Sequence, residues 1–219
     1  MADAVIFDLD GLLLESEQVW NAAKEQLTRE RGGRWRAETQ HTMLGMSSPE
    51  WARYMHDELE VPLAPDQISA EVVRLVAATY ERELPLLPGA DAAVRRIGEH
   101  RPLGLASSSN REIIELVLER TGWGELFGVT VSSEEVERGK PAPDVYLEAA
   151  RRLAAPPQRC VAVEDSSAGI RAARAAGMAV IAIPNRAYPP PPEVVSEASV
   201  VLDSLYELDR EVTERGGAK

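Results

Sequence analysis

The stretch VIFDLDGLLLESE, residues 5–17, places two carboxylates at the end of an apolar run. Residues 4–8 are predicted to form a buried strand, and Asp8 and Asp10 then stand one residue apart, followed by Gly11. Like charges this close repel each other strongly when they are partly removed from water. The rest of the sequence must therefore supply a compensating positive charge. The position of that charge would indicate a functional site.

The composition is that of a globular protein with an acidic surface. The chain has 219 residues, of which 44% are hydrophobic and 27% charged, and this predicts one domain or one domain with an insertion. A net charge of −12 argues against a nucleic-acid partner. No apolar run reaches the ~18 residues that span a bilayer, and no signal peptide is evident, so we expect a cytoplasmic protein without a membrane partner. Cys160, the single cysteine, is expected to be a small buried hydrophobe.

Short apolar runs alternate with helical patterns along most of the chain. Continuous apolar runs are typical of parallel strands buried on both faces, and the alternation predicts right-handed crossovers. The predicted fold class is α/β, a doubly wound parallel sheet of the Rossmann-like kind. The predicted strands are residues 4–8, 103–107, 129–132, 160–164, 179–183 and 199–202, and the predicted helices are residues 90–99, 110–121, 143–154, 166–176 and 204–215.

Residues 17–83 break this alternation, because they contain helical patterns and no convincing strand. One of these helices is predicted to begin with Ser48 as its N-cap. The simplest interpretation is a helical domain, residues 15–85, inserted after the first strand of a core domain that comprises residues 1–14 and 86–219. An insertion held by two linkers can move as a lid.

Polar residues gather at the predicted carboxyl ends of the strands, where open parallel sheets bind their ligands. Besides the two aspartates of the first strand, they are Ser107 and Ser108 after the second strand, Lys140 after the third, and Glu164 and Asp165 at the end of the fourth. Each has an ordinary alternative explanation; Ser109, for instance, could cap a helix together with Glu112. Their convergence on one edge of a sheet indicates a common site.

Four carboxylates and one lysine would leave an excess of negative charge at that edge. Carboxylate oxygens clustered without cysteine or histidine favour Mg²⁺, which we expect as the cofactor. Ser107 and the backbone N–H groups at the start of the next helix can hold phosphate oxygens. The pattern therefore predicts Mg²⁺-dependent phosphoryl transfer, with a small phosphorylated metabolite as the partner.

Such chemistry needs two acids with different roles. Asp8, at the strand end, would attack phosphorus and give an acyl phosphate. Asp10 would protonate the leaving group and then activate water. The competing nucleotide-binding pattern GxxxxGK does not occur in the sequence.

Four segments carry a resemblance to a known family: DLDGLLLESE, ASSSN, GKPAPDVYLEAA and VEDSSAGIRAARAAGM. In this order they resemble the four motifs of the haloacid dehalogenase (HAD) superfamily, over essentially the whole chain. Within it, the chain is similar to the subgroup of β-phosphoglucomutase-like proteins and sugar-phosphate phosphatases. The resemblance implies a HAD-like core with a small helical cap and a hydrolase that works through an aspartyl phosphate.

The resemblance also implies a role for each residue of the site. The implied metal ligands are Asp8, the backbone carbonyl of Asp10, Asp165 and Glu164, the last either directly or through water. The implied phosphoryl ligands are Ser107, Ser108 and Lys140. The implied specificity positions of the cap are Trp20, Gly45, Met46 and Ser47.

The reaction type stays open between hydrolysis and an intramolecular phosphoryl shift. Trp20 and Ser48 stand where β-phosphoglucomutases carry a histidine and an arginine, and the neutral loop 43–48 offers no cation for a second phosphate. Hydrolysis of a sugar or polyol phosphate is therefore favoured over the alternative of a phosphosugar mutase. A non-catalytic sensor of phosphorylated metabolites is a third interpretation, and a monomer is the default expectation.

Overall fold

The computed structural model describes residues 2–43 and 46–209. The chain divides into two compact units, one formed by Met1–Glu15 with Pro85–Lys219 and the other by Ser16–Leu84. That residues 15–85 act as a lid stays a prediction.

The first unit is built on a parallel sheet whose strand order, among the described residues, is β3-β2-β1-β4-β5-β6. The strands are β1 (Ala4–Phe7), β2 (Leu103–Ser107), β3 (Phe127–Ser132), β4 (Cys160–Glu164), β5 (Ala179–Ala182) and β6 (Val200–Val201). The central strands β1, β2 and β4 are buried along their whole length, because helices cover both faces of the sheet. The predicted doubly wound α/β fold is confirmed.

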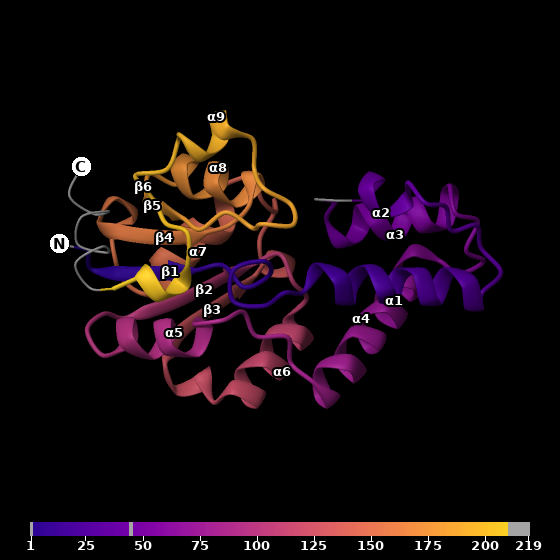
Figure 1. Cartoon of the computed structure of the whole chain (residues 1–219), viewed down its shortest axis with the longest axis horizontal. Helices are drawn as coiled ribbons and strands as arrows, with labels where there is room; N and C mark the ends of the chain where they lie inside the picture. Colours follow the sequence, from indigo (N-terminus) through magenta and orange to yellow (C-terminus); the bar gives the residue numbers. More distant parts are fainter. Residues whose placement is uncertain (1, 44–45, 210–219) are drawn as a thin grey trace. The chain divides into compact units, whose positions relative to one another are not determined.

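Helices pack on both faces of this sheet, with α8 and α9 on one side and α5 and α6 on the other (Figure 1). The helices of this unit are α5 (Ala90–Gly98), α6 (Arg111–Thr121), α7 (Asp144–Arg152), α8 (Ser167–Ala175) and α9 (Pro192–Val195), with short 3₁₀ turns η1 (Trp123–Glu125), η2 (Ser133–Glu135), η3 (Pro157–Arg159) and η4 (Leu205–Glu207). Each of these α-helices lies in the chain between two strands of the parallel sheet, as crossover connections require.

Alternate strand residues fill one layer of the core. Ile6, Ala162 and Val131 belong to a buried cluster that also contains residues of α7 and α8. Phe7, the next residue along β1, makes an edge contact with Phe127 at a centroid separation of 6.1 Å. Cys160 belongs to the same buried cluster as Ile6 and is fully buried, as expected of a small hydrophobe.

The predicted C-terminal helix, residues 204–215, is wrong over the part that the structure describes. Only the 3₁₀ turn η4 forms there, while residues 210–215 lie outside the described residues. Arg96 on α5 donates hydrogen bonds to the carbonyls of Leu205 and Leu208, at 3.1 and 2.6 Å. Those carbonyls would be needed for α-helical hydrogen bonds, so the arginine holds the segment in a tighter turn.

The second unit is helical, with no strand among its described residues. Its helices are α1 (Glu17–Glu30), α2 (Thr39–Thr42), α3 (Ser48–Asp57) and α4 (Pro65–Arg82). α1 and α3 both pack on α4, whose apolar face buries Ile68, Val72 and Val76. Across the described residues of the chain, no helix combines the length and the apolar character needed to cross a membrane.

The cap of α3 differs by one residue from the predicted one. Ser47, not Ser48, is the N-cap, and its backbone N–H and hydroxyl both donate to Glu50, at 2.7 and 2.6 Å. Ser48 is already the first helical residue and Pro49 follows it, so the capping box spans Ser47 to Glu50.

Two chain segments of the first unit run side by side at its junctions with the second. Leu14 and Leu86 form an antiparallel bridge, and the backbone N–H of Glu15 donates to the carbonyl of Pro85 at 2.8 Å. Leu87 donates in turn to Leu13 at 2.9 Å. The chain therefore leaves and re-enters the first unit through a hydrogen-bonded pair of segments.

Candidate active site

The candidate site lies at the carboxyl ends of β1, β2 and β4, which are neighbours in the sheet. Asp8 follows the last residue of β1, and its backbone N–H donates to the carbonyl of Val163 in β4 at 3.0 Å. Its side chain is 7% exposed. The strand thus holds a buried carboxylate in a fixed position at the edge where ligands bind.

Lys140 reaches this carboxylate from the loop after β3. Its ammonium donates to Asp8 Oδ1 at 2.5 Å and to Glu164 Oε1 at 2.6 Å, and 4% of its side chain is exposed. One buried ammonium therefore joins the end of β1 to the end of β4. It supplies a positive charge beside Asp8, the first acid of the opening motif, and beside Glu164.

Glu164 is fully buried, and donors of the protein surround both of its oxygens. Oε1 accepts from Lys140 and from the hydroxyl of Tyr146 at 2.6 Å. Oε2 accepts from the backbone N–H of Asp165 at 3.1 Å and from the N–H and hydroxyl of Ser166 at 3.3 and 3.2 Å. A β-carbon at Gly169 would lie 1.7 Å from Oε1, so this position of α8 has room for glycine alone.

Asp10 is held by serines rather than by the lysine. Its Oδ2 accepts from the hydroxyls of Ser107 and Ser109, at 3.2 and 2.6 Å. Its Oδ1 is buried and has no hydrogen-bond partner among the described residues. The interpretation of Ser109 as a helix cap is wrong, because α6 has Asn110 as its N-cap and the Ser109 hydroxyl binds Asp10 instead.

Burial and nearby carboxylates raise the pKa of two carboxyl groups of the site, Asp8 and Asp165, and so favour their neutral forms. Burial raises the pKa of Asp8 to about 7, although Lys140 opposes the shift. Burial, with Glu164 and Asp8 nearby, raises the pKa of Asp165 well above its usual value. Burial alone would lower the pKa of Lys140, but Asp8 and Glu164 outweigh it and raise the pKa above its usual value. The lysine therefore stays charged while the acids lack a full set of counterions.

The residues present fit a hard divalent cation. Asp8, Glu164 and Asp165 each offer an oxygen, and these oxygens lie within 4.8 Å of one another. Asp165 Oδ1 is buried without a hydrogen-bond partner among the described residues. An all-oxygen donor set with an unpartnered buried oxygen suits a cation such as Mg²⁺.

Ser107 and Ser108, the predicted phosphoryl ligands, differ in their surroundings. Ser107 ends β2 and is fully buried, and its hydroxyl also accepts from the backbone N–H of Ser109 at 2.9 Å. Ser108 is exposed. The hydroxyl of Ser107 thus already has protein partners, whereas Ser108 faces solvent.

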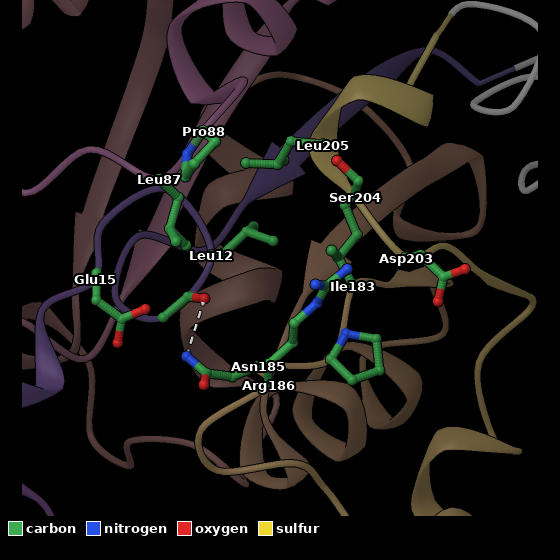
Figure 2. A pocket seen from close by; sticks show the side chains of 12 residues that line it. Leu12, Glu15, Leu87, Pro88, Ile183, Asn185, Arg186, Asp203, Ser204 and Leu205 are labelled. Carbon is green, nitrogen blue, oxygen red and sulfur yellow. Dashed lines mark hydrogen bonds between the residues drawn. The ribbon is translucent and has the colours of Figure 1, made fainter.

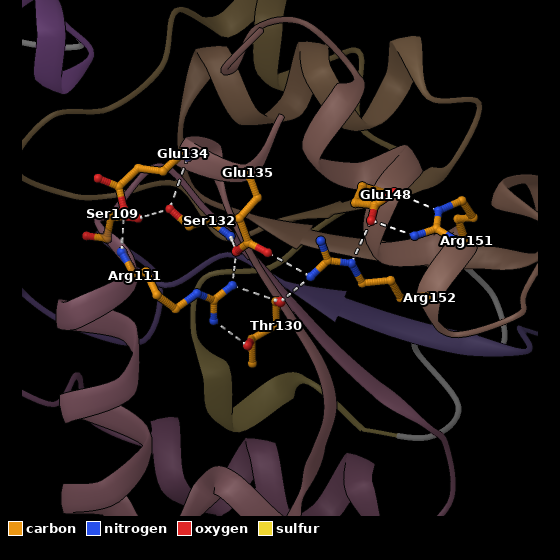
Figure 3. A network of polar contacts seen from close by, with 9 residues as sticks. All are labelled: Ser109, Arg111, Thr130, Ser132, Glu134, Glu135, Glu148, Arg151 and Arg152. Atoms are coloured by element: carbon orange, nitrogen blue, oxygen red, sulfur yellow. Dashed lines mark hydrogen bonds and ion pairs between the residues drawn. The ribbon is translucent and has the colours of Figure 1, made fainter. Parts of the chain in front are cut away.

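A polar network joins the loop after β2 to the loop after β3 (Figure 3). Glu134 accepts from the side-chain amide of Asn110 at 2.6 Å and from the backbone N–H of Arg111 at 2.8 Å. The Ser132 hydroxyl donates to the carbonyl of Ser109 at 2.7 Å. Glu134 therefore occupies one of the N–H groups at the start of α6 that we expected to bind phosphate.

The same network continues along the edge strand β3. Arg111 and Arg152 both form ion pairs with Glu135, and both donate to the carbonyl of Thr130, at 3.1 and 3.2 Å. Figure 3 shows the two arginines approaching Glu135 and Thr130 from opposite sides. This edge of the sheet is covered by side chains, which discourages pairing with another strand.

The predicted specificity residues lie in the helical unit. Trp20 on α1 is half-buried and packs at a tilt against Trp51, with ring centroids 6.4 Å apart. Met46 is half-buried, while Ser47 is exposed and engaged with Glu50. Gly45 lies outside the described residues.

A pocket of about 370 Å³ lies on the first unit, beside the turn that follows Asp10 (Figure 2). Its walls combine apolar and polar side chains, and Asn185 donates there to the carbonyl of Gly11 at 3.4 Å. The lining residues are Gly11, Leu12, Glu15, Leu87, Pro88, Ile183, Pro184, Asn185, Arg186, Asp203, Ser204 and Leu205. The carboxylate cluster is not part of this lining, so the pocket and the candidate site are distinct features.

Comparison with known families decides the identity of the fold. Residues 2–177 match the family described as haloacid dehalogenase-like hydrolase. The chain belongs to this family. In this HAD-like hydrolase, the four predicted motifs lie at the ends of neighbouring strands.

Relatives of this HAD-like chain include proteins named as phosphatases. Hexitol phosphatase B of Escherichia coli is 35% identical over 211 residues, covering 94% of this chain and 93% of that protein. The bifunctional riboflavin kinase/FMN phosphatase of Arabidopsis thaliana is 34% identical over 210 residues, but the chain spans only 55% of its length. The crystal structure of CbbY from Rhodobacter sphaeroides in complex with phosphate has a TM-score of 0.88 and 28% identity, covering 98% of this chain and 100% of that one.

Sequence reasoning missed three residues that shape the site. Tyr146 lay within the predicted helix 143–154 and Gly169 within the predicted helix 166–176, and neither was given a role in the site. Ser109 was considered only as an alternative helix cap. No local pattern distinguishes these roles, since each depends on a carboxylate distant in the sequence.

Proposed function

We propose that this HAD-like hydrolase is a Mg²⁺-dependent phosphatase of a small sugar or polyol phosphate that acts through an aspartyl phosphate on Asp8. The observation that carries the proposal is the contact between the buried Asp8 carboxylate and the Lys140 ammonium, at 2.5 Å, beside the unpartnered oxygen of Asp165. The relatives named as phosphatases support the same reaction.

The first step is attack by a carboxylate oxygen of Asp8 on phosphorus. The bond from phosphorus to the ester oxygen breaks, and the leaving alkoxide takes a proton from Asp10. Asp10 is held for this role by the hydroxyls of Ser107 and Ser109. In the second step Asp10 accepts a proton from water, which attacks phosphorus and regenerates the Asp8 carboxylate.

The charges of the site support binding of a phosphoryl dianion. Lys140 offsets part of the negative charge on the transferring group, and it is held in place by Glu164. Bound Mg²⁺ would offset the rest and keep Asp8 ionised. We assign Asp8, Asp165 and the Asp10 backbone carbonyl as its ligands.

Glu164 is better suited to anchoring the lysine than to binding the metal directly. Five protein donors already occupy its two oxygens, at 2.6–3.3 Å. A direct metal bond would have to displace at least one of them. We therefore propose that Glu164 acts on the metal through water or not at all.

The helical unit is proposed to select the substrate. Trp20, Met46 and Ser47 remain the proposed specificity positions, with Gly45 outside the described residues. Ser47 is the weakest of them, because its hydroxyl is engaged in the capping box of α3.

The test is hydrolysis of p-nitrophenyl phosphate and of a panel of sugar and polyol phosphates, with Mg²⁺ and after removal of metal by a chelator. Asp8→Asn is expected to lower kcat by at least about a thousandfold, as loss of a nucleophile does. Asp203→Asn, at an exposed aspartate of the same unit, is the matched control and should leave kcat unchanged. Full activity in Asp8→Asn or after chelation would contradict the proposal, and an isomerised sugar phosphate in place of free phosphate would support a mutase.

A further inference from the structure

Tyr146 places a hydroxyl next to the charged groups of the site, although it belongs to the core. It lies on α7 and is fully buried among residues of the core layer. Its hydroxyl donates to Glu164 Oε1 at 2.6 Å and accepts from Lys140 at 3.3 Å. The Lys140 ammonium also lies 4.9 Å from the centre of the tyrosine ring.

Packing alone does not account for this hydroxyl. A phenylalanine would fill the same apolar space, and a buried hydroxyl is unfavourable unless it forms hydrogen bonds. Here the hydroxyl bonds to the one oxygen of Glu164 that also anchors Lys140. Glu164 Oε2 is held by backbone and serine donors of its own loop, so Oε1 is the only oxygen shared with the lysine.

The position of Lys140 depends on a balance between two carboxylates. Its ammonium lies 2.5 Å from Asp8 and 2.6 Å from Glu164. The O–H of Tyr146 partly neutralises Glu164 Oε1 and fixes its direction. Without this donor, Glu164 would attract the ammonium more strongly and draw it away from Asp8.

We propose that Tyr146 is a positioning residue, whose hydroxyl holds Glu164 so that Lys140 stays beside Asp8 and can bind the transferring phosphoryl group. This inference rests on the proposed phosphatase function. Helix α7 would thereby contribute to phosphate binding although Tyr146 does not contact the substrate. The ligand affected is the phosphoryl group itself, whichever alcohol it is attached to.

The experiment measures binding of inorganic phosphate in the presence of Mg²⁺, by calorimetry and by competitive inhibition, in the full chain. Tyr146→Phe is expected to weaken phosphate binding about tenfold and to raise KM by a similar factor, as loss of a hydrogen bond to a charged group does. kcat and the Mg²⁺ concentration for half-maximal activity should change less than about threefold. The matched control is Tyr206→Phe, because Tyr206 is 65% exposed and should behave as wild type.

A double-mutant cycle separates positioning from a general effect on packing. In a Lys140→Met background, Tyr146→Phe should change phosphate binding less than about twofold, because the two residues act as one unit. The same tenfold factor in both backgrounds, an unchanged affinity in Tyr146→Phe, or a chain that no longer folds would overturn the proposal. A wild-type chain that neither binds nor hydrolyses phosphate esters would overturn the proposed function, and this inference with it.

Discussion

Asp8 and Asp10 are one residue apart in the sequence, but the structure gives them different environments. Asp8 is buried and contacts Lys140, whereas Asp10 accepts hydrogen bonds from two serine hydroxyls. The pKa of Asp8 is raised to about 7 by burial. The two carboxyl groups thus lie in unlike surroundings, as the two proposed roles would require, and Asp8 would need a bound cation to stay ionised as a nucleophile.

A pH-dependent effect of Mg²⁺ on stability follows from the raised pKa of Asp8. Without metal, the folded chain holds this proton more tightly than the unfolded chain, so the stability it contributes is complete below about pH 4 and is lost as the pH rises through about 7. In the proposed site Mg²⁺ would bind this carboxylate, and it should then restore stability at the higher pH. We therefore expect Mg²⁺ to raise Tm more at about pH 8 than at about pH 5.

Thermal unfolding with and without saturating Mg²⁺ at the two pH values checks this expectation. Asp8→Asn, which has no carboxylate to ionise, should lose most of the pH dependence of the Mg²⁺ effect. An equal increase in Tm at both pH values in the wild-type chain would contradict the assignment of Asp8 as a metal ligand.

Gly169 provides a second test at the scale of single residues. Its α-carbon lies against the carboxylate of Glu164, and an added β-carbon would meet Oε1 at 1.7 Å. Gly169→Ala should therefore displace Glu164 and reduce activity, and it should destabilise the chain by about 1–3 kcal/mol, as overpacking of a core does. Gly124→Ala is the matched control, because an added β-carbon there would meet no atom within 4 Å. Wild-type activity in Gly169→Ala would show that the position of Glu164 is not critical.

At the scale of elements, helix α6 and the loop after β3 stabilise each other. Glu134 accepts hydrogen bonds from Asn110 and Arg111 at the N-terminus of α6. Because negative charge is favourable at this end of a helix, Glu134→Gln is expected to lower the free energy of unfolding by about 0.3–1 kcal/mol. Glu137→Gln, at an exposed residue of the same loop, should have a smaller effect. Chemical denaturation of the two variants measures the difference, and equal effects would contradict the role given to Glu134.

The outcome of the sequence predictions differs between elements for physical reasons. The strands were predictable because β1, β2 and β4 are continuous apolar runs buried on both faces. The helix predicted at residues 204–215 was wrong over the described residues 204–209, where Arg96, more than a hundred positions earlier, donates to the carbonyls of Leu205 and Leu208. Ser47 rather than Ser48 is the cap of α3, because its backbone N–H and its hydroxyl both donate to Glu50 in that register.

The candidate site was predictable to the extent that it depends on strand ends. Parallel strands end at one edge of the sheet, which explains why Asp8, Glu164 and Asp165 lie together. Their functional roles stay predictions. Tyr146 and Ser109 could not be found in this way, because their contacts are set by side-chain directions rather than by sequence spacing.

At the scale of the whole molecule, the chain combines a HAD-like core with a helical unit inserted between β1 and α5. The charged residues of the candidate site all come from the core unit. We therefore propose that the core carries out the chemistry and that the helical unit selects the substrate. The central proposal is the phosphorylation of Asp8.

The most direct measurement of that claim is the trapping of the phosphorylated chain. In Asp10→Asn, an aryl phosphate should still phosphorylate Asp8, because its phenolate leaves without a proton, but water would no longer be activated and the intermediate should accumulate. Intact mass and peptide analysis after an acid quench are expected to find one phosphoryl group on Asp8, removed by hydroxylamine and absent from the Asp8→Asn, Asp10→Asn double variant. Turnover of the aryl phosphate with no phosphate on Asp8, or with phosphate on another residue, would contradict the account.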